Sequence, residues 1–548
     1  MVLRYSYSSR VGECRGRLDG THEQECGDVF DVWVRPGGME WTERVRAGVH
    51  VVQLGLFVLY VSVLLGFGLL VLRAMRARQR RDREWLRRTR PSKDDASCAA
   101  SGNAARDAKD AFVVSFLHPH ALAGGGGERV LWLAIKALRG RFPDATDLKI
   151  RVFTKGAPRK ADVLEKVFVQ FGIDIFTTQF ELRELWSESL LDGARYPFCT
   201  LLLQFLAGAI AGVECTLLHV ATDLFIDTTG HAASLAVAKW LGGCHVATYV
   251  HYPTISTDMV HVVRSRTSQF NNSSRIADSL FLSGAKLAYY RLFSHMYGLA
   301  GGCADVVMVN SSWTRSHISS LWSGSRRKIS LVFPPIDTKP LLAFGMDKRD
   351  PALIVSVAQF RPEKNHALQI EAFVKLLHKQ SRDPRSDTLR PRLVMIGGCR
   401  NADDAARVEL LLYEIQNTYH LRVPDQVELL VNVTRDQLHA YLAKASAAIH
   451  TMKDEHFGIS VVEFQAAGVI AVAHNSGGVA LDIIQNGKSG FLAETADQFA
   501  DCLSSALSLN SSSRLAMIQT ARDAASRYSD EGFATEVLKA LQRVLPVD

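Results

Sequence analysis

The chain has 548 residues, which is too long for one compact hydrophobic core, so at least two domains are expected. Hydrophobic residues make up 47% and charged residues 22% of the chain, a balance that excludes a largely disordered protein. The net charge of +8 arises mostly from residues 73–90, which contain nine arginines and two acidic residues. Because the excess is confined to one short segment, we expect no nucleic-acid partner.

One segment near the N-terminus is predicted to cross a membrane. Residues 47–72 run for 26 positions without a formal charge, and about 20 apolar residues suffice for a helix to span a bilayer. The segment is too long, and wrongly flanked, for a cleaved signal peptide. Because the arginine-rich segment follows it, the positive-inside rule places residues 1–46 in a lumen and the rest of the chain in the cytosol. Cys14 and Cys26 could then pair, whereas the wide spacing of the other cysteines predicts neither zinc nor a disulfide framework.

After a polar linker that ends at residue 110, short apolar runs alternate with segments of helical periodicity. In the first half, the pattern predicts a helix at 128–138, a later helix capped by Asn310 or Ser311, and strands at 111–117, 148–153, 247–250 and 304–309. In the second half, it predicts helices at 368–378 and 435–445 and strands at 352–358, 392–396, 426–430, 447–450 and 470–473. Such alternation is typical of parallel sheets with helices on both faces.

The predicted fold class is therefore α/β, with two doubly wound Rossmann-like domains that face each other across a cleft. The expected parts are a short lumenal segment at 1–46, the membrane helix at 47–72, a basic flank and linker at 73–110, the first domain at 111–337 and the second at 338–548. The last helix is expected to cross back to the first domain. Paired domains of this kind bind their ligands between the carboxyl ends of the two sheets.

A second apolar stretch, at residues 198–213, is 16 residues long and thus short for a membrane span. Its composition fits a buried helix of the first domain, and it also fits a helix that dips into one leaflet. A second full span is disfavoured, because it would place the two domains on opposite sides of the membrane.

The most informative segment is DEHFGISVVEFQAAG at 454–468, in which seven residues separate Glu455 from Glu463. A helix is expected from Ile459 onward, so Glu455 precedes it and Glu463 lies about one turn inside it. A helix N-terminus that faces a cleft can bind a diphosphate, and carboxylates beside it can accept hydrogen bonds from sugar hydroxyls. The glycine turn NSGGVALDII at 475–484 opens a further helix nearby in the sequence.

This segment resembles the E-x7-E motif of retaining glycosyltransferases of the GT-B fold that use nucleotide sugars. Further segments resemble one group among them, the eukaryotic GDP-mannose-dependent α-1,2-mannosyltransferases of the dolichol-linked oligosaccharide pathway. These segments are FLHPHALAGGGGERVLW at 116–132, TYVHYPTISTDM at 248–259, NSSWT at 310–314, VFPPIDT at 332–338 and SVAQFRPEKN at 356–365. The resemblance covers about residues 111–548 and rests on the whole set of motifs.

The resemblance implies roles for residues of the E-x7-E segment. Glu463 would bind the ribose hydroxyls of GDP. Glu455 would hold the transferred mannose at the reaction centre, together with main-chain amides near Phe457, Gly458 and Ile459.

Cations for the donor diphosphate are expected in the segment 356–365. Lys364 matches the lysine that grips the diphosphate in the family. The arginine that the family usually carries five residues earlier is Gln359 in this chain. Arg361, two residues after Gln359, is the candidate to supply that charge, since fixed cations stabilise a diphosphate leaving group.

Two histidines of the first domain are candidates for the cleft. His251, in YVHYP, takes the place of the family histidine that approaches the donor sugar near the reacting carbon. His118 is a candidate for the acceptor side.

Four glycines, Gly124 to Gly127, lie between the first predicted strand and the helix at 128–138. No Gly-Lys-Ser/Thr follows them, which excludes a P-loop, and the acidic residue of a dinucleotide-binding motif is not evident. We expect a loop that faces the donor site and whose bare backbone approaches substrate. Gly125 and Gly126 are candidates for donor contact, and Gly124 and Gly127 for acceptor contact.

The implied reaction is mannose transfer with retention at the anomeric carbon, drawn in the family as a front-face displacement in which the departing phosphate takes the acceptor proton. No cofactor and no metal site are expected, because lysine, arginine and a helix N-terminus would stabilise the phosphate charge; GDP-mannose is a co-substrate. The second carboxylate belongs to nucleotide binding, so the pair is not read as a glycosidase acid and nucleophile.

The resemblance further implies two successive α-1,2-mannose additions to a dolichol-diphosphate oligosaccharide with three mannoses. The chain would be a single-pass protein of the endoplasmic reticulum membrane, in contact with its lipid, with catalytic domains in the cytosol and other mannosyltransferases of the pathway as partners. Other interpretations are a different retaining transferase acting on glycolipid or using another nucleotide sugar, and a catalytically silent scaffold subunit of a glycosylation complex.

Overall fold

The computed structural model describes Gly66, Gly68 and residues 112–546, with gaps at 144–147, 157, 197, 219–221, 256–258, 260–279, 347–348 and 383–389. The predictions for the lumenal segment, the membrane helix and the basic flank, and the pairing of Cys14 with Cys26, therefore lie outside the described residues, apart from two glycines of the span.

The first domain is built on a parallel sheet with the strand order β3-β2-β1-β4-β5-β6-β7. The strands are β1 (Phe112–Leu117), β2 (Leu148–Thr154), β3 (Glu181–Glu184), β4 (Leu224–Asp227), β5 (His245–Val250), β6 (Val306–Val309) and β7 (Ile329–Leu331). The four predicted strands correspond to β1, β2, β5 and β6, and the sequence reading missed β3, β4 and β7. Two of the missed strands have four residues and one has three, and β3 is an edge strand with the polar sequence ELRE.

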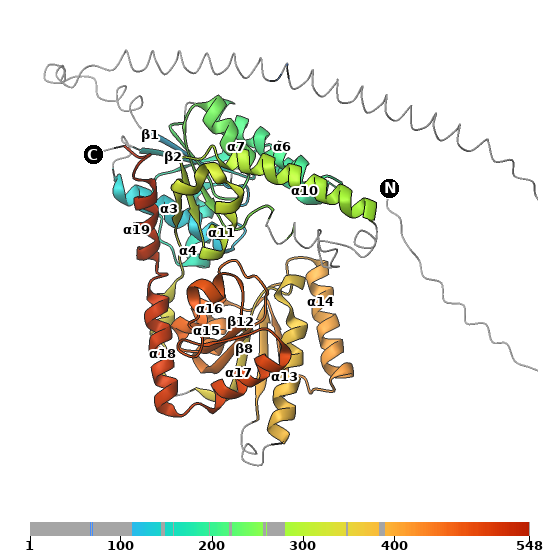
Figure 1. The fold of residues 1–548 in the computed structure, drawn as a ribbon. Helices are drawn as coiled ribbons and strands as arrows, with labels where there is room; N and C mark the ends of the chain where they lie inside the picture. Colours follow the sequence, from blue (N-terminus) through green and yellow to red (C-terminus); the bar gives the residue numbers. More distant parts are fainter. Residues whose placement is uncertain are drawn as a thin grey trace, which may run out of the picture. The chain divides into compact units, whose positions relative to one another are not determined.

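Helices cover both faces of this sheet (Figure 1). They are α3 (Gly126–Arg141), α4 (Lys160–Phe171), α5 (Glu188–Leu191), α6 (Thr200–Val213), α7 (Ala232–Val237), α10 (Leu280–Gly301) and α11 (Ser312–Leu321). The predicted cap is confirmed, because the Ser311 hydroxyl accepts a hydrogen bond from the Thr314 amide at 3.1 Å.

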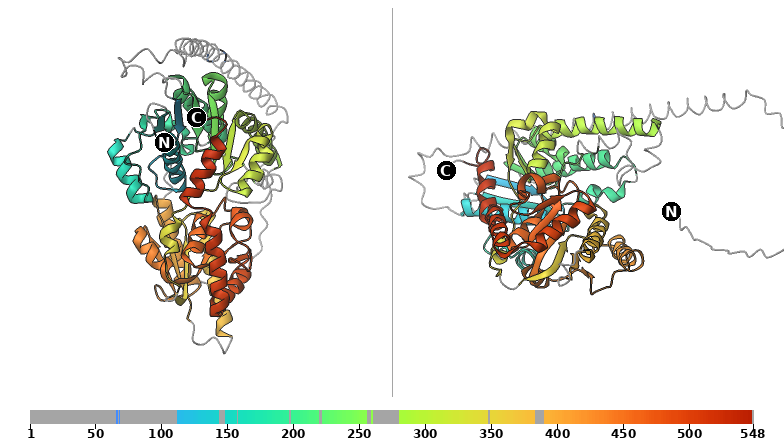
Figure 2. Two further views of the ribbon diagram at one scale, coloured as in Figure 1. Left: turned by 90° about the vertical axis from the view of Figure 1, so that its left-hand side faces the viewer. Right: turned by 60° about the horizontal axis from the view of Figure 1, so that its bottom comes forward.

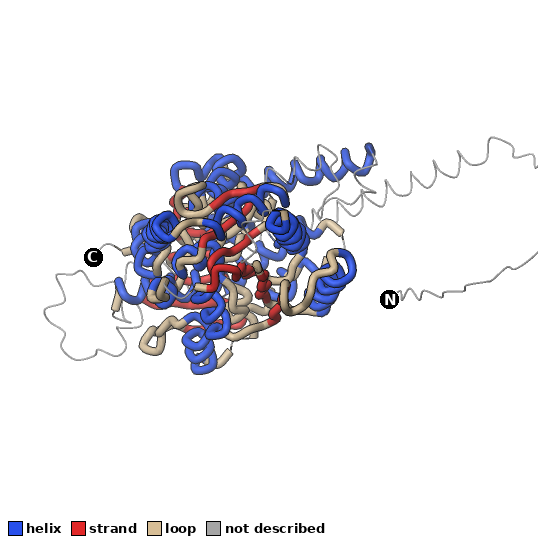
Figure 3. The backbone as a smooth tube through the Cα atoms, turned by 90° about the horizontal axis from the view of Figure 1, so that it is seen from below, coloured by secondary structure: helices blue, strands red, loops and turns tan. Residues whose placement is uncertain are grey.

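The second domain repeats the plan with a parallel sheet of order β10-β9-β8-β11-β12-β13. Its strands are β8 (Asp350–Val357), β9 (Arg392–Gly397), β10 (Val427–Val431), β11 (Ala445–His450), β12 (Ile470–His474) and β13 (Phe491–Ala493). Its helices are α12 (Thr338–Leu342), α13 (His366–Ser381), α14 (Ala402–Tyr413), α15 (Arg435–Lys444), α16 (Ile459–Ala467), α17 (Ala496–Ser508) and α18 (Ser511–Ser526). In Figure 3 the strands occupy the interior and the helices surround them, as continuous apolar strands require.

The final helix, α19 (Asp530–Leu541), packs against α3 of the first domain. Phe533, Val537 and Leu541 of α19 are buried in the same apolar core as β1 and α3. Figure 2 shows this red helix running from the second domain onto the first. The chain therefore passes between the domains twice, once after β7 and once before α19.

The apolar stretch at 198–213 forms α6, which continues to Leu218 as a π-helical turn. Of the described helices, Thr200–Leu218 is the one long and apolar enough to span a bilayer, and 44% of its most apolar window is buried. Its inner face is made of small residues, and a Cβ on Gly212 would lie 2.9 Å from the Cα of Ser234, so α6 and α7 pack closely. Its outer face exposes Leu203, Leu206 and Ile210. One face of α6 is thus buried against the first domain, and the opposite face is apolar but exposed.

Candidate active site

The E-x7-E segment follows the carboxyl end of β11, at the edge of the second sheet. Gly458 precedes α16 with a φ of +112°, and a Cβ there would lie 2.6 Å from Val479, so this position requires glycine. The helix begins at Ile459, as predicted. Glu455 therefore lies in the loop before α16, and Glu463 lies about one turn inside it.

Glu455 is held in a cluster of charged and polar groups. The Lys364 Nζ lies 2.5 Å from Glu455 Oε2, and the His450 Nε2 lies 3.1 Å from the same oxygen. Burial acts to raise the pKa of Glu455, but the hydrogen bonds and positive charge of His450 and Lys364 hold that pKa well below its usual range. Glu455 is therefore ionised at neutral pH, and it fixes the ammonium of Lys364 at the mouth of the loop.

The loop that carries Glu455 is supported by the turn NSGG. The Gly478 amide donates to the Glu455 carbonyl at 2.7 Å, and the Asp454 amide donates to the Ser476 hydroxyl at 2.6 Å. A Cβ on Gly477 would overlap main-chain atoms of Glu455, and one on Gly478 would overlap the His456 carbonyl. The sequence predicted a glycine turn in this stretch, but it did not predict that the turn supports the loop that carries Glu455.

Glu463 borders a cavity of about 880 Å³ that both domains line. Four predicted donor residues lie on it: Gly125, Gly126, Ile459 and Glu463. The predicted acceptor residue Gly124 also lies on this cavity, and the predicted donor residues Lys364, Arg361, Phe457 and Gly458 do not line it. The size is that of a cavity for a nucleotide-sized ligand.

The cavity also contains charged groups that the sequence did not single out. Arg129 donates to the Phe171 carbonyl at 2.6 Å and to Asp530 at 2.7 Å, and Arg435 pairs with Asp337. Burial raises the pKa of Glu463 to about 7, against the opposing charges of Arg129 and Arg435. Glu463 is thus poised to change its ionisation near neutral pH.

Arg361 does not join the cluster around Glu455. Its guanidinium lies 3.6 Å from Glu363, and both side chains are about two-fifths exposed. Gln359, at the family's arginine position, lies instead beside Arg400. In the orientation that suits its surroundings, its amide oxygen accepts from Arg400 Nε at 3.2 Å and Nη2 at 2.5 Å. Arg400 is 41 residues away from Gln359 in sequence, and no motif in the sequence pointed to this contact.

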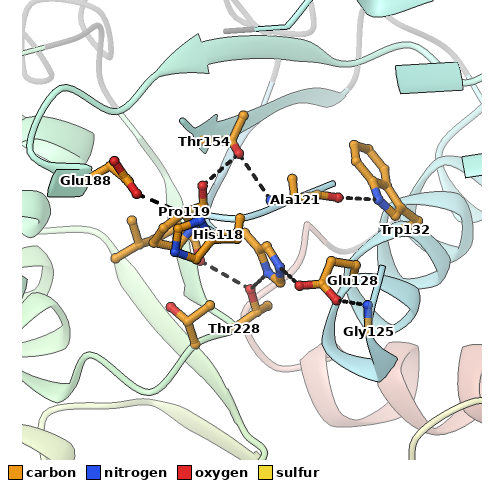
Figure 4. A network of polar contacts seen from close by, with 12 residues as sticks. His118, Pro119, Ala121, Gly125, Glu128, Trp132, Thr154, Glu188 and Thr228 are labelled. Atoms are coloured by element: carbon orange, nitrogen blue, oxygen red, sulfur yellow. Dashed lines mark hydrogen bonds and ion pairs between the residues drawn. The ribbon is translucent and has the colours of Figure 1, made fainter. Parts of the chain in front are cut away.

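On the first-domain side, the loop after β1 is ordered by a network of polar contacts (Figure 4). The His118 Nδ1 lies 2.7 Å from the Thr228 hydroxyl, and its Nε2 lies 3.6 Å from Glu128. Glu128 in turn accepts from the Gly125 amide at 2.6 Å. Burial acts to raise the pKa of Glu128, but the contacts with His118 and Gly125 lower it. His118, which is buried, thus orients the glycine loop.

The four glycines divide between the loop and α3. Gly124 has a φ of +87°, Gly125 precedes the helix, and Gly126 and Gly127 form its first positions. The helix therefore starts two residues before the predicted Glu128, because the Glu128 carboxylate caps the Gly125 amide and offsets the low helix propensity of glycine. A Cβ on Gly126 would overlap the Cδ1 of Ile459, so the two domains are in close contact here.

His251 follows β5, beside the first turn of α3. A Cβ on Gly127 would lie 3.5 Å from the His251 Nε2. This nitrogen is buried, and among the described residues it has no hydrogen-bond partner. Burial, together with the nearby charge of His118, lowers the pKa of His251 to about 4. His251 is therefore a neutral imidazole with a free nitrogen, and Asn310 fixes its main chain by donating to the His251 carbonyl at 2.8 Å.

Aromatic and polar contacts join the two domains next to this histidine. The ring of His456, from the second domain, lies 4.6 Å from Tyr252 and 5.2 Å from Trp313, centroid to centroid. Asp482 of the second domain accepts from the Ser312 amide at 2.7 Å, at the start of α11. Sequence reasoning missed these pairings, because each joins residues more than 140 positions apart.

Two family models match this chain. The first, described as "ALG11 mannosyltransferase N-terminus", matches residues 111–322, and the second, "Glycosyl transferases group 1", matches residues 344–524. The mouse GDP-Man:Man(3)GlcNAc(2)-PP-Dol alpha-1,2-mannosyltransferase is 42% identical over 453 residues, which cover 81% of this chain and 89% of the relative. The Dictyostelium discoideum protein of the same name is 38% identical over 437 residues, which cover 79% of this chain and 85% of the relative.

Solved structures with the same arrangement of domains have diverged much further in sequence. An α,α-trehalose 6-phosphate synthase from Burkholderia multivorans has a TM-score of 0.55 at 14% identity, covering 79% of this chain and 98% of that one. Anabaena Alr3699/HepE in complex with UDP and glucose has a TM-score of 0.51 at 16% identity, covering 78% of this chain and 99% of that one. The described residues thus have the GT-B fold, with two parallel Rossmann-like sheets.

Proposed function

Because the chain belongs to the family of the GDP-Man:Man(3)GlcNAc(2)-PP-Dol α-1,2-mannosyltransferases, we infer that it transfers α-1,2-linked mannose from GDP-mannose to that dolichol-linked acceptor. The chain adds two mannoses in succession, the fourth and the fifth of the oligosaccharide. One observation supports the proposal for this chain: the loop before α16 holds the ion pair of Glu455 and Lys364, and the same helix carries Glu463 at the border of the cavity.

The donor lies along the second domain. Ribose hydroxyls donate to Glu463 in the cavity, and the diphosphate lies between Lys364 and the N-terminus of α16, where unpaired amides and a cation both favour negative charge. Arg361, beside Lys364 in sequence, extends toward the diphosphate when the donor is bound. Phe457, Gly458 and Ile459 contribute the main chain at this point.

The mannose lies between Glu455 and His251. Glu455 is ionised and accepts from mannose hydroxyls, while the free Nε2 of the neutral His251 bonds to the sugar from the other side. An acceptor hydroxyl then attacks the anomeric carbon as its bond to the diphosphate breaks on the same face. The acceptor proton passes to the departing phosphate, whose charge Lys364 stabilises.

The decisive experiment supplies the purified full-length chain with GDP-mannose and Man(3)GlcNAc(2)-PP-dolichol. We expect products with four and then five mannoses, and removal of the added mannoses by an α-1,2-specific mannosidase. No product, a β-linked product or transfer from a UDP-sugar in preference to GDP-mannose would refute the proposal. A Glu463→Ala variant that still complements loss of the cellular activity would favour a scaffold role.

We place the chain in the endoplasmic reticulum membrane through the span at 47–72, with its catalytic domains in the cytosol, beside other mannosyltransferases of the pathway. The exposed apolar face of α6 supports contact of the first domain with lipid. The sequons at Asn271, Asn272, Asn310, Asn432 and Asn510 test this topology. In a cytosolic domain none carries glycan, so a shift in mobility after endoglycosidase treatment would contradict it.

A further inference from the structure

A second cavity, of about 290 Å³, lies in the first domain between α6, α10 and the loops after β4 and β5. The residues used for the donor and the transferred mannose do not line it. Its walls include four aromatic rings, those of Phe205, Tyr252, Phe293 and Tyr297. The volume is near the lower end of the range for ligand pockets, which suits one part of an oligosaccharide rather than the whole.

The chemistry of this second cavity differs from that of the donor cavity. None of the described residues that line it is a lysine, arginine, aspartate or glutamate. Its one ionisable imidazole, His231, has a pKa that burial lowers, so it is neutral at pH 7. A diphosphate would find no cation here. Aromatic faces beside neutral hydrogen-bonding groups fit instead a neutral sugar, whose C–H faces are apolar and whose rim is hydroxylated.

Several polar groups in the walls are positioned by the protein while retaining capacity for a ligand. The Thr229 hydroxyl donates to Asp227 Oδ1 at 3.0 Å, so its lone pairs stay available as acceptors. The Tyr297 hydroxyl accepts from the Thr254 amide at 3.4 Å and also hydrogen-bonds to the Thr254 side chain, so it is held against the loop after β5. Behind Thr229, the fully buried Asp227 Oδ2 has no hydrogen-bond partner among the described residues.

The cavity lies between the reaction centre and the apolar face of α6. Tyr252, at one end, directly follows His251 and contacts His456, which directly follows Glu455. At the other end, Leu201 and Phe205 belong to α6, whose outer face exposes leucine and isoleucine side chains. A sugar in the cavity would therefore have the reacting mannose on one side and a lipid-facing helix on the other.

We propose that this cavity is an acceptor subsite, which binds a neutral sugar residue of the acceptor oligosaccharide while the lipid stays along α6. The proposal rests on the proposed function for the identity of the acceptor. Thr229, Tyr297 and the aromatic rings recognise the sugar, and they take no part in donor binding.

Two variants test the subsite in the full-length chain. Leu201→Trp narrows the cavity and is expected to raise the KM for Man(3)GlcNAc(2)-PP-dolichol at least about thirtyfold, with the KM for GDP-mannose unchanged. Thr229→Val removes one hydrogen-bonding group and is expected to raise the acceptor KM roughly three- to tenfold. The matched controls, Leu410→Trp and Thr177→Val, change exposed residues away from the cavity and should leave both constants unchanged.

A binding measurement tests the acceptor subsite independently of the transfer reaction. Free Man(3)GlcNAc(2), which has no lipid, should show saturation-transfer NMR signals with the wild-type chain and lose them with Leu201→Trp, while both proteins still bind GDP. If wild-type transfer fails, the proposed function fails, whatever the NMR shows. If transfer succeeds but both variants keep the wild-type acceptor KM, or raise the donor KM equally, the subsite is refuted. A defect that vanishes with the lipid-free acceptor would assign the cavity to lipid and overturn the sugar proposal.

Discussion

On the second-domain side of the cleft lies the ion pair between Lys364 and Glu455, whereas the first domain carries the glycine loop and, against its Gly127, the neutral imidazole of His251. The charged side suits a nucleotide diphosphate, which needs fixed cations. The glycine backbone and the neutral imidazole suit a sugar, which needs close approach and hydrogen bonds, although the first domain also places Arg129 on the cavity. Under the proposed function, this difference divides the binding of the charged donor and the positioning of the neutral sugar between the two domains.

The glycines of the two domains also differ in what an added side chain would meet. A Cβ on Gly478 would meet the main chain of the loop that carries Glu455, which cannot move without displacing that carboxylate. A Cβ on Gly126 would meet the end of the Ile459 side chain, which can rotate. The second domain is therefore expected to tolerate change less than the first, and substitutions on the two sides can measure the difference.

The largest expected effect follows from Lys364→Met. The variant removes the cation that we propose stabilises the leaving diphosphate, and it leaves Glu455 with His450 as its partner. We expect a loss of about a thousandfold in kcat, as for removal of a group that stabilises transition-state charge. The control is Lys375→Met on α13, which breaks an exposed pair with Asp497 of α17 and should keep wild-type kcat. A loss under tenfold for Lys364→Met would show that the charged side does not act on the leaving group.

A smaller loss is expected from Gly478→Ala. The added methyl pushes against the His456 carbonyl and shifts the loop, and a displacement of about 1 Å can cost about a hundredfold in rate. The measurement is kcat with donor and acceptor both saturating. Gly345→Ala serves as control, since a Cβ there meets no atom within 4 Å. Near-normal activity of Gly478→Ala would mean that the loop position is not critical.

The sequence could predict the elements that are continuous in the chain, and less of what the fold brings together. The apolar strands β1 and β8 and the turn before α16 were identified because their signals are local. The central strand β4 was missed, since LFID is short and ends in the buried Asp227. Motifs identified Lys364 and Glu455 singly, but they are 91 residues apart, and no pattern predicts their contact. Burial raises the pKa of Glu463 and the charges of Arg129 and Arg435 oppose that shift, although the two arginines lie 334 and 28 residues away in sequence.

A pH dependence of about tenfold is expected from Glu463. Its pKa is about 7 in the fold, so its ionised fraction rises about tenfold between about pH 6 and pH 8. In the proposed complex the ionised form accepts both ribose hydroxyls, so affinity for GDP should rise by a similar factor over this range in the wild type. Glu463→Gln should bind GDP weakly and without this rise. Glu455, whose pKa stays below its usual range, adds no step there, so a pH-independent wild type would contradict the assignment.

Ionisation of Glu463, which should strengthen GDP binding, should lower the stability of the fold. The pKa of Glu463 is raised in the fold from an ordinary value of 4.5, so the folded chain holds this proton more tightly than the unfolded chain. The cost of ionising it is absent below about pH 4.5, grows as pH rises and is complete above about pH 7. Glu463→Gln avoids the cost and should be more stable by up to about 3 kcal/mol at about pH 8 in urea unfolding. Equal stability at that pH would contradict the raised pKa.

The smallest expected effect belongs to the first-domain side. Gly126 has no left-handed φ, and the atom that its new methyl would meet in Gly126→Ala is the terminal Cδ1 of Ile459. We expect kcat to fall only a few-fold, roughly 0.5–1.5 kcal/mol for one side chain forced off its preferred rotamer. Ile459→Ala in the same chain makes room and should restore most of the loss. If Gly126→Ala instead matched Gly478→Ala in severity and Ile459→Ala gave no rescue, the backbone at Gly126 would itself contact substrate, and the two sides of the cleft would be equally intolerant of change.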